Sequence, residues 1–244
     1  GFSEDDTLVG QAPFGSRTFD ASVIMEPGTE PAPANLRVVK IIDSAAATTD
    51  PVFKGDTGEL YYPFATGMTE GQVSLSIQYG VNETKKAYIS LYDSAGSTKS
   101  LIGELQLDEG KFALRSNAGG NDPIGAPDFT PGDWIDVVMT WNTSDLVNPG
   151  TYSVYIDGTL YGPYTSENIT PGVLVESTSV RLADNGDTSD DAIYIDNLKV
   201  YSDEAGVTTP LLDEDFEGFD VDTTLVGQAP FGSRTFDATV GAKE

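Results

Sequence analysis

The chain has 244 residues, of which 13 are Lys or Arg and 39 are Asp or Glu, so its formal net charge is −26 at pH 7. It contains no His and no Cys, which excludes a Ser-His-Asp triad, a thiolate nucleophile, a disulfide framework and metal sites built from imidazole or thiolate. The negative charge also disfavours nucleic acid and anionic lipid as partners, because both bind to basic surfaces.

The composition indicates one folded domain. At 39% hydrophobic and 10% aromatic residues, the chain can fill a core despite its acidity, and its length suits a single all-β domain of about 200–250 residues. No stretch approaches the roughly 18 apolar residues of a membrane span, and no basic-then-apolar leader opens the chain. We therefore expect no membrane insertion, and the acidity fits a secreted, extracellular or cell-surface protein.

The first segment of the chain returns near its end. Residues 1–23 and 218–240 are identical at 19 of 23 positions, at an offset of 217. Similarity of this quality indicates a tandem array, although a short duplicated loop motif is the alternative. We expect residues 1–210 to form one module and residues 211–244 to begin the next repeat, with the strand at 211–219 completing the sheet of the preceding module beside residues 193–201.

Period-two alternation between Gly, Pro, Asn and Asp punctuation predicts about a dozen strands. The clearest case is Gln72–Tyr79, where Val73, Leu75, Ile77 and Tyr79 share one face and Ser and Gln residues share the other. Repeated antiparallel strands predict an all-β, two-sheet antiparallel β-sandwich of the jelly-roll kind. The further predicted strands, in chain order, are 18–24, 35–42, 58–62, 86–92, 100–107, 111–116, 134–141, 151–156, 173–175, 179–183 and 192–201.

Three motifs resemble a known family. Pro131–Trp141 and Tyr152–Gly158 are similar to the tryptophan strand and the YxDG hairpin of laminin-G-like, concanavalin A-like lectin and glucanase domains, and Asp191–Tyr201 is similar to their closing strand. The resemblance implies a concanavalin A-like jelly roll over about residues 18–201. Independently of the family, Asp157-Gly158 is a strong hairpin signal, because a type I′ turn needs positive φ at both residues.

A calcium site follows from a second resemblance. Laminarinase-type β-glucanases of this fold open with an acidic strand and close with another, and Glu214–Gly218 and Ile195–Tyr201 are similar to these. The resemblance implies a structural calcium bound by Asp196 with Asp215 or Glu217 and by a carbonyl such as that of Gly218, which are ligands that calcium prefers. The alternative is a solvated acidic strand edge.

Catalytic groups of the enzymes that share this fold are not matched. Retaining glucanases place two carboxylates about 5–5.5 Å apart on one strand. The nearest match, Glu104–Glu109, has Gln106 at the central position, and we expect a solvated strand face with Leu105 and Leu107 on the core side. The alginate lyases use a neutralising Arg/Gln set with His and Tyr, but this chain has no His and no Arg-Glu-Arg strand. We therefore expect no enzyme.

Carbohydrate binding remains, because aromatic faces stack on sugar rings and planar polar side chains bind hydroxyls. Lys111 and Arg115 share one strand face and would suit the uronate or sulfate of an acidic algal or microbial glycan, although surface salt bridges are the alternative. For the aromatic candidates the alternative is core packing. The candidate carbohydrate-binding residues are Lys111, Arg115, Asn117, Arg37, Gln78, Tyr88, Trp141 and Tyr155.

The resulting hypothesis is a secreted, non-catalytic carbohydrate-binding module of a polysaccharide-active or surface protein, with a structural Ca²⁺. Its partners would be a polysaccharide and neighbouring repeats of the same polypeptide. One alternative is a calcium-stabilised structural or adhesin repeat with no glycan site of its own. Another is a degenerate glycan lyase or glucanase.

Overall fold

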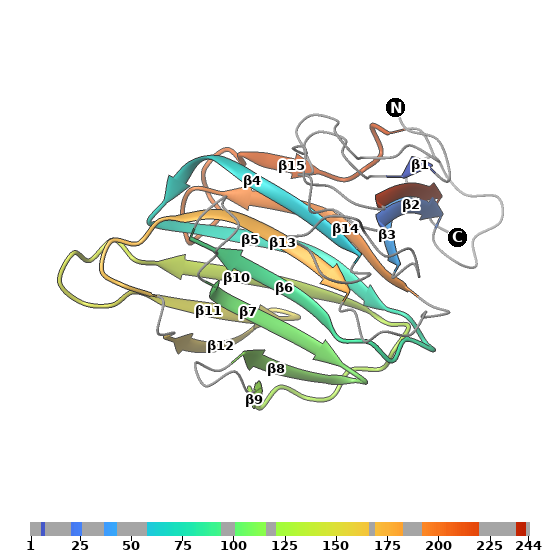
Figure 1. Cartoon of the computed structure of the whole chain (residues 1–244), viewed down its shortest axis with the longest axis horizontal. Coiled ribbons are helices and arrows are strands. Elements are labelled where there is room, and N and C mark those ends of the chain that lie inside the picture. Colours follow the sequence, from blue (N-terminus) through green and yellow to red (C-terminus); the bar gives the residue numbers. More distant parts are fainter. Residues whose placement is uncertain are drawn as a thin grey trace, which may run out of the picture.

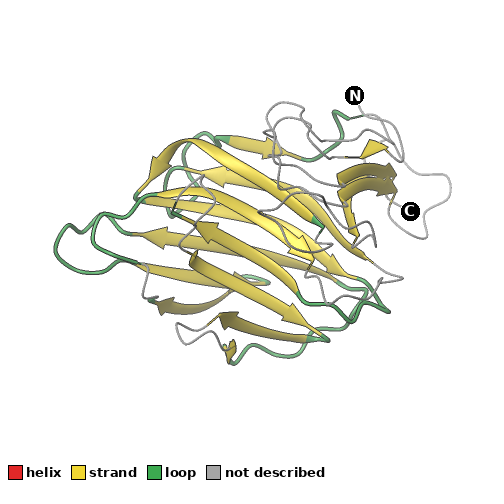
Figure 2. Cartoon of the chain, in the orientation of Figure 1, coloured by secondary structure: helices red, strands yellow, loops and turns green. Residues whose placement is uncertain are grey.

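The computed structural model describes residues 6–7, 21–25, 37–42, 58–93, 101–115, 121–165, 169–182, 192–219 and 238–242. Within these residues every regular element is a strand (Figure 2), so the predicted two-sheet antiparallel β-sandwich is confirmed. The same residues include no helix long and apolar enough to cross a membrane.

The strands form two sheets (Figure 1). The larger sheet has the order β1-β16-β2-β3-β14-β5-β10-β11-β12, with β15 paired to β14. Its strands are β1 (Asp6–Thr7), β2 (Ala21–Met25), β3 (Arg37–Ile42), β5 (Glu70–Tyr79), β10 (Trp134–Asn142), β11 (Thr151–Ile156), β12 (Thr159–Tyr164), β14 (Ala192–Tyr201), β15 (Leu212–Glu214) and β16 (Ala238–Ala242).

The smaller sheet has the order β4-β13-β6-β7-β8-β9. All of its pairings are antiparallel. Its strands are β4 (Glu59–Met68), β6 (Ala87–Tyr92), β7 (Leu101–Asp108), β8 (Lys111–Arg115), β9 (Asn121–Pro123) and β13 (Val175–Leu182).

One hydrophobic core lies between the sheets, because alternate residues of facing strands turn inward. On β5 the four predicted residues Val73, Leu75, Ile77 and Tyr79 are buried, as the alternation required. The sheets approach closely where Gly103 of β7 meets the ring of Tyr152 on β11, since a Cβ at residue 103 would lie 2.9 Å from that ring.

Trp141 belongs to this core, which corrects its assignment as a carbohydrate-binding residue. Its side chain is 1% exposed and stacks on Phe64 of the other sheet, with ring centroids 6.0 Å apart. The indole Nε1–H donates to the carbonyl of Met68. The residue therefore has no face left for a sugar ring, and on β10 it is Trp134 and Val138 that lie on the outer side.

Two strands differ from the sequence-based prediction. β13 is continuous from residue 175 to 182, where two short strands were expected, because Ser177 and Ser179 occupy outward positions within one ladder. β12 was not predicted, since its sequence contains Gly162 and Pro163. A strand at the end of a sheet tolerates these residues, because one edge of β12 pairs with no other described strand.

Two local predictions are confirmed, the turn at Asp157-Gly158 and the pairing of the acidic segment after residue 210 with the closing strand. Asp157 and Gly158 both have positive φ, of 48° and 76°, and join β11 to β12 as expected of a type I′ turn. β15 pairs antiparallel with β14, with Leu198 opposite Glu214, so the acidic segment after residue 210 lies against the closing strand. The domain boundary at residue 210 stays a prediction.

Candidate functional site

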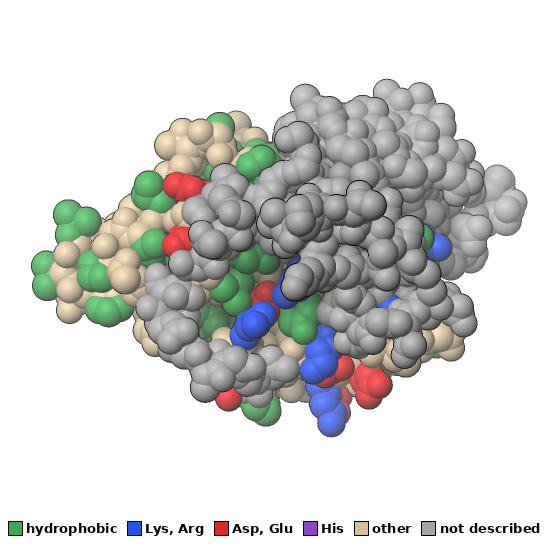
Figure 3. All heavy atoms as spheres, in the orientation of Figure 1, with side chains coloured by type: hydrophobic (Ala, Val, Ile, Leu, Met, Phe, Trp, Pro, Cys, Tyr) green, Lys and Arg blue, Asp and Glu red, His purple; other side chains and the backbone are tan. Residues whose placement is uncertain are grey.

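The outer face of the six-stranded sheet gathers cationic side chains. Antiparallel register places Arg181 beside Tyr88, and Tyr88 beside Gln106. Lys111 lies opposite Asp108 at the start of β8, and Arg115 ends that strand on the same face. Figure 3 shows Lys and Arg side chains together with acidic ones on this side of the molecule. In a chain with 13 cations and a net charge of −26, this is a notable concentration of positive charge.

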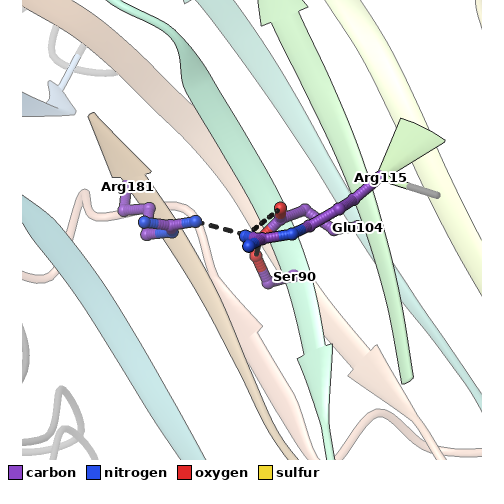
Figure 4. A network of polar contacts seen from close by, with 4 residues as sticks. All are labelled: Ser90, Glu104, Arg115 and Arg181. Atoms are coloured by element: carbon purple, nitrogen blue, oxygen red, sulfur yellow. Dashed lines mark hydrogen bonds and ion pairs between the residues drawn. The ribbon is translucent and has the colours of Figure 1, made fainter. Parts of the chain in front are cut away.

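Two arginines converge on one buried carboxylate at the centre of this face (Figure 4). Glu104 of β7 is 1% exposed, and its Oε2 accepts from Arg181 at 3.1 Å and from the Ser90 hydroxyl at 2.7 Å. Arg115 lies 3.5 Å from its Oε1 and is 48% exposed. The cluster Arg181–Glu104–Arg115 thus comes from strands β13, β7 and β8.

Arg181 remains charged in this setting. Burial by itself would lower the pKa of its guanidinium, but Tyr92, Glu104 and Glu59 outweigh that effect and the pKa is raised. The guanidinium carbon also lies 4.2 Å from the centroid of the Tyr88 ring, a cation–π arrangement. Burial raises the pKa of Tyr88 although Arg181 acts in the opposite direction, so its hydroxyl keeps its proton at neutral pH.

Several buried polar atoms around the cluster have no hydrogen-bond partner among the residues that the structure describes. They are Ser177 Oγ, Ser179 Oγ, Gln106 Oε1 and Arg181 Nε. All four residues occupy outward positions of the same sheet. Each unsatisfied buried group costs about 1–3 kcal/mol, so a buried water molecule that bonded these donor and acceptor atoms would lower this cost.

The structure brings together only some of the predicted carbohydrate-binding residues. Lys111, Arg115 and Tyr88 lie on the outer face of the six-stranded sheet. Gln78 and Tyr155 lie on the outer face of the other sheet, where Gln78 donates to the carbonyl of Gly132 at 2.8 Å. These five residues therefore cannot form one site, because the two faces point in opposite directions.

A further candidate, Arg37, lies on the larger sheet and not beside the cluster. Arg37 begins β3 and holds the segment after β15: its Nη1 donates to the carbonyl of Glu217 at 3.0 Å and to that of Phe219. Asn117 lies outside the described residues. The sequence-based set thus contributes Lys111, Arg115 and Tyr88 to the site.

Glu104, Arg181, Ser90 and Gln106, which form or adjoin the cluster, were not among the predicted binding residues. Glu104 was expected on a solvated face, and its outward orientation is right, with Leu105 and Leu107 on the core side. The predicted solvent exposure of Glu104 is wrong, because its side chain is buried against Arg181. The sequence does show that charged residues take the outward positions of β7, β8 and β13, but it does not show that these strands lie near one another.

The predicted calcium ligands lie near one another at the β14–β15 edge. Burial raises the pKa of Glu217, the N–H and charge of Arg37 act in the opposite direction, and the nearby charges of Asp215 and Asp196 add to the rise. Asp196 Oδ1 accepts from the N–H of Asn197 at 2.7 Å, and Asp215 Oδ1 accepts from that of Glu217 at 3.1 Å.

The fit to a calcium ion is partial. Glu217 Oε2 is buried and has no hydrogen-bond partner in the described part of the chain, which leaves one oxygen for a cation. Within the described ranges, however, no group of three acidic side chains is arranged to hold a metal, and the Arg37 guanidinium already supplies positive charge to the carbonyls of Glu217 and Phe219. Calcium at Asp196, Asp215, Glu217 and Gly218 stays a prediction.

Comparisons with known proteins bear on the fold. No protein-family model and no curated protein matches this chain. Among solved structures, the chain is similar to the endo-β-1,4-glucuronan lyase of the fungus Trichoderma reesei, with a TM-score of 0.51 and 12% identity over 76% of this chain and 89% of the lyase. This likeness shows a shared β-sandwich fold.

Two further solved structures are less similar. One is the alginate lyase vAL-1 from Chlorella virus, with a TM-score of 0.47 and 12% identity over 75% of this chain and 93% of that chain. The other is a tetrameric galectin from the sponge Cinachyrella sp., with a TM-score of 0.42 and 13% identity over 59% of this chain and 99% of the galectin.

The prediction that this protein is not an enzyme is corrected. The solved structure whose fold it shares is named as a lyase. The prediction also cited the absence of an Arg-Glu-Arg strand, and none of the described strands carries one. Arg181, Glu104 and Arg115 instead form an ion-paired cluster from three strands.

Proposed function

We propose that this protein binds an acidic, uronate-containing polysaccharide on the outer face of the six-stranded sheet. The observation that carries the proposal is that the exposed cations Lys111 and Arg115 share this face with the Arg181–Glu104 pair, to which Arg115 is joined. A uronate residue supplies a carboxylate, which suits the planar arginine fork.

The glycan-related names of the similar solved structures agree with this choice. Fold likeness alone does not carry function, so the proposal rests on the face itself. The same hypothesis includes two further proposals: the protein is secreted or lies at the cell surface, and it stands beside further repeats of the same polypeptide.

Cleavage of the bound glycan by β-elimination is a second candidate, favoured by the Tyr88–Arg181 pair. In that reaction a water molecule takes up the proton next to the carboxylate, the C–O bond to the leaving sugar breaks, and the electrons of the C–H bond form a C=C bond. An arginine that neutralises the carboxylate makes this proton more acidic. Tyr88, whose pKa is raised, is the residue we propose to protonate the leaving oxygen.

Affinity electrophoresis tests the binding proposal. We expect alginate and pectate to retard the protein and neutral laminarin to retard it less, with retardation weakening as salt is added. Arg115→Gln should weaken binding about tenfold, because it removes a charge-assisted contact. Lys199→Gln, which removes a cation from the other sheet where Lys199 pairs with Asp213, is the matched control.

The outcomes separate the hypotheses. If alginate and pectate do not retard the protein, or if Arg115→Gln binds as tightly as Lys199→Gln, the proposed site is wrong and a spacer or adhesin role is favoured. Growth of the ultraviolet absorbance of the new C=C bond, lost in Tyr88→Phe with binding retained, would support cleavage.

A further inference from the structure

The two copies of the repeated segment pair with the same strand in the same register. Strand β2 of the first copy places Ala21 opposite Ile41 and Val23 opposite Val39. Strand β16 of the second copy places Ala238 opposite Ile41 and Val240 opposite Val39. Since the copies are offset by 217 residues, Ala238 and Val240 are the repeat equivalents of Ala21 and Val23.

The equivalence extends beyond β3. Ile24 and its repeat equivalent Gly241 both lie opposite Val38, although the sequences have diverged there. On the far side, Thr7 of β1 pairs with Ser22 and also with Thr239, which are again equivalent positions. Figure 1 shows β1, β2, β3 and β16 grouped at one end of the sheet, beside both termini.

A strand has only two edges, but three strands, β2, β14 and β16, pair with β3. Strand β14 pairs with β3 through Ile193 opposite Ile41 and Ile195 opposite Val39, which uses one edge. The other edge can give its N–H and C=O groups to a single strand in a given register. The strands β2 and β16 also pair with each other in parallel, with Ala238 opposite Ala21, so both lie at this edge of β3 although only one of them can complete its ladder there.

We propose that β2 and β16 are alternative occupants of the place beside this edge of β3, and that the copy left out fills the same place beside β3 of a second copy of this unit. The partner is another copy of this chain, or the next repeat of a longer one, and recognition is strand addition through main-chain hydrogen bonds. Exchange of an identical element between protomers requires no new interface, because the donated strand meets the same neighbours as the original.

Redundancy provides the first test. Proline removes an amide and disrupts a ladder, so Val23→Pro disables the first copy and Val240→Pro disables the second. We expect each single variant to lower the Tm by less than about 3 °C, since the other copy takes the place, and the double variant to lower it by clearly more than the sum. Additive effects would overturn the proposal.

Disulfide trapping supplies a second test that does not depend on destabilised variants. The chain has no Cys, so introduced pairs report without background. Lys40 lies opposite Ser22 and also between the partners of Ala238 and Val240, which puts it opposite Thr239. Directly opposed Cα atoms in an antiparallel pair are about 4.5–5.5 Å apart, within disulfide range.

We expect both Ser22→Cys/Lys40→Cys and Thr239→Cys/Lys40→Cys to form the bond on mild oxidation. Failure of either pair would show that only one copy occupies the place and would overturn the proposal. Exchange between molecules is tested by mixing two variants. The accepting chain, Val23→Pro/Lys40→Cys/Val240→Pro, carries a cysteine on β3 and both of its own copies are disabled. The donating chain, Thr239→Cys, carries a cysteine on its second copy. A disulfide-linked pair of chains is expected on a non-reducing gel, in excess of that from Thr239→Cys mixed with Lys40→Cys alone. No such excess would overturn exchange between molecules.

Discussion

At the scale of single residues, Glu104 shows how much a neighbouring strand changes the meaning of a side chain. Alternation along β7 predicts that it points away from the core, and it does. Yet it is 1% exposed and held by Arg181 and Ser90, because strands β6 and β13 bring those residues alongside. An outward residue at the middle of a sheet is not necessarily a solvated residue.

Glu104→Gln and Arg115→Gln should differ in their effect on stability. Glu104→Gln leaves Arg181, which is 23% exposed, without its closest counter-charge, and we expect the free energy of unfolding to fall by about 2–4 kcal/mol. Arg115→Gln removes a pair that is 48% exposed on the arginine side, and we expect a loss below about 1 kcal/mol. Denaturant unfolding of both variants measures the difference; equal losses would contradict a buried Arg181–Glu104 pair.

At the scale of elements, the β14–β15 edge concentrates acidic groups in partial burial. Lys199 of β14 binds Asp213 of β15 at 2.8 Å, but the neighbouring Glu214 has no such cation among the described residues. The pKa of Glu214 is raised to about 8, chiefly by burial and in smaller part by the charges of Asp215 and Asp213, while the N–H of Phe216 acts in the opposite direction. The sequence predicted the pairing of these strands, but not which of their carboxyl groups would be buried.

The free energy of unfolding should therefore decrease as the pH rises, because of Glu214. Its pKa is about 8 in the folded chain against 4.5 as the ordinary value, so the folded state binds more protons between these values. The stabilisation is complete below about pH 4.5, declines through this window and is lost above about pH 8. Glu214→Gln should flatten this part of the profile and raise stability at pH 8 by more than about 1 kcal/mol.

Unfolding in urea at several pH values measures the effect. Glu204→Gln, which removes the same charge from an exposed loop position, is the control for net charge. If both variants shift the profile equally, the burial of Glu214 is not the cause.

At the scale of the whole molecule, the net charge of −26 acts on every fold the chain adopts, because like charges repel in the compact state. The described cations partly offset it in local clusters, such as the one around Glu104 and the Lys86–Asp108 pair. Added salt should therefore raise the Tm by screening, whether or not a metal binds.

A comparison at equal ionic strength separates screening from the predicted calcium site. We expect calcium to raise the Tm more than NaCl does, to saturate, and to lose its excess in Asp215→Asn but not in Glu204→Gln. Equal effects of the two salts would show that calcium acts as a screening ion and that the prediction at Asp196, Asp215 and Glu217 is wrong. Chelation followed by calorimetry provides the same comparison in reverse.

The sequence by itself determined the all-β class, the inward and outward faces of β5, β7 and β8, and the turn at Asp157-Gly158. These features are local, because side chains alternate with a period of two and turn residues set their own φ. The repeat was also visible in the sequence, at an offset of 217 residues.

Only the tertiary structure decided which strands are neighbours, since strand order is set by contacts distant in sequence. It placed Arg181 beside residues that precede it by 77 positions and more, put Gln78 and Tyr155 on the opposite sheet, and buried Trp141 in the core. It also brought both copies of the repeat to one edge of β3. Alternation gives the face of a residue but carries no information about the strand beside it, and a binding site depends on both.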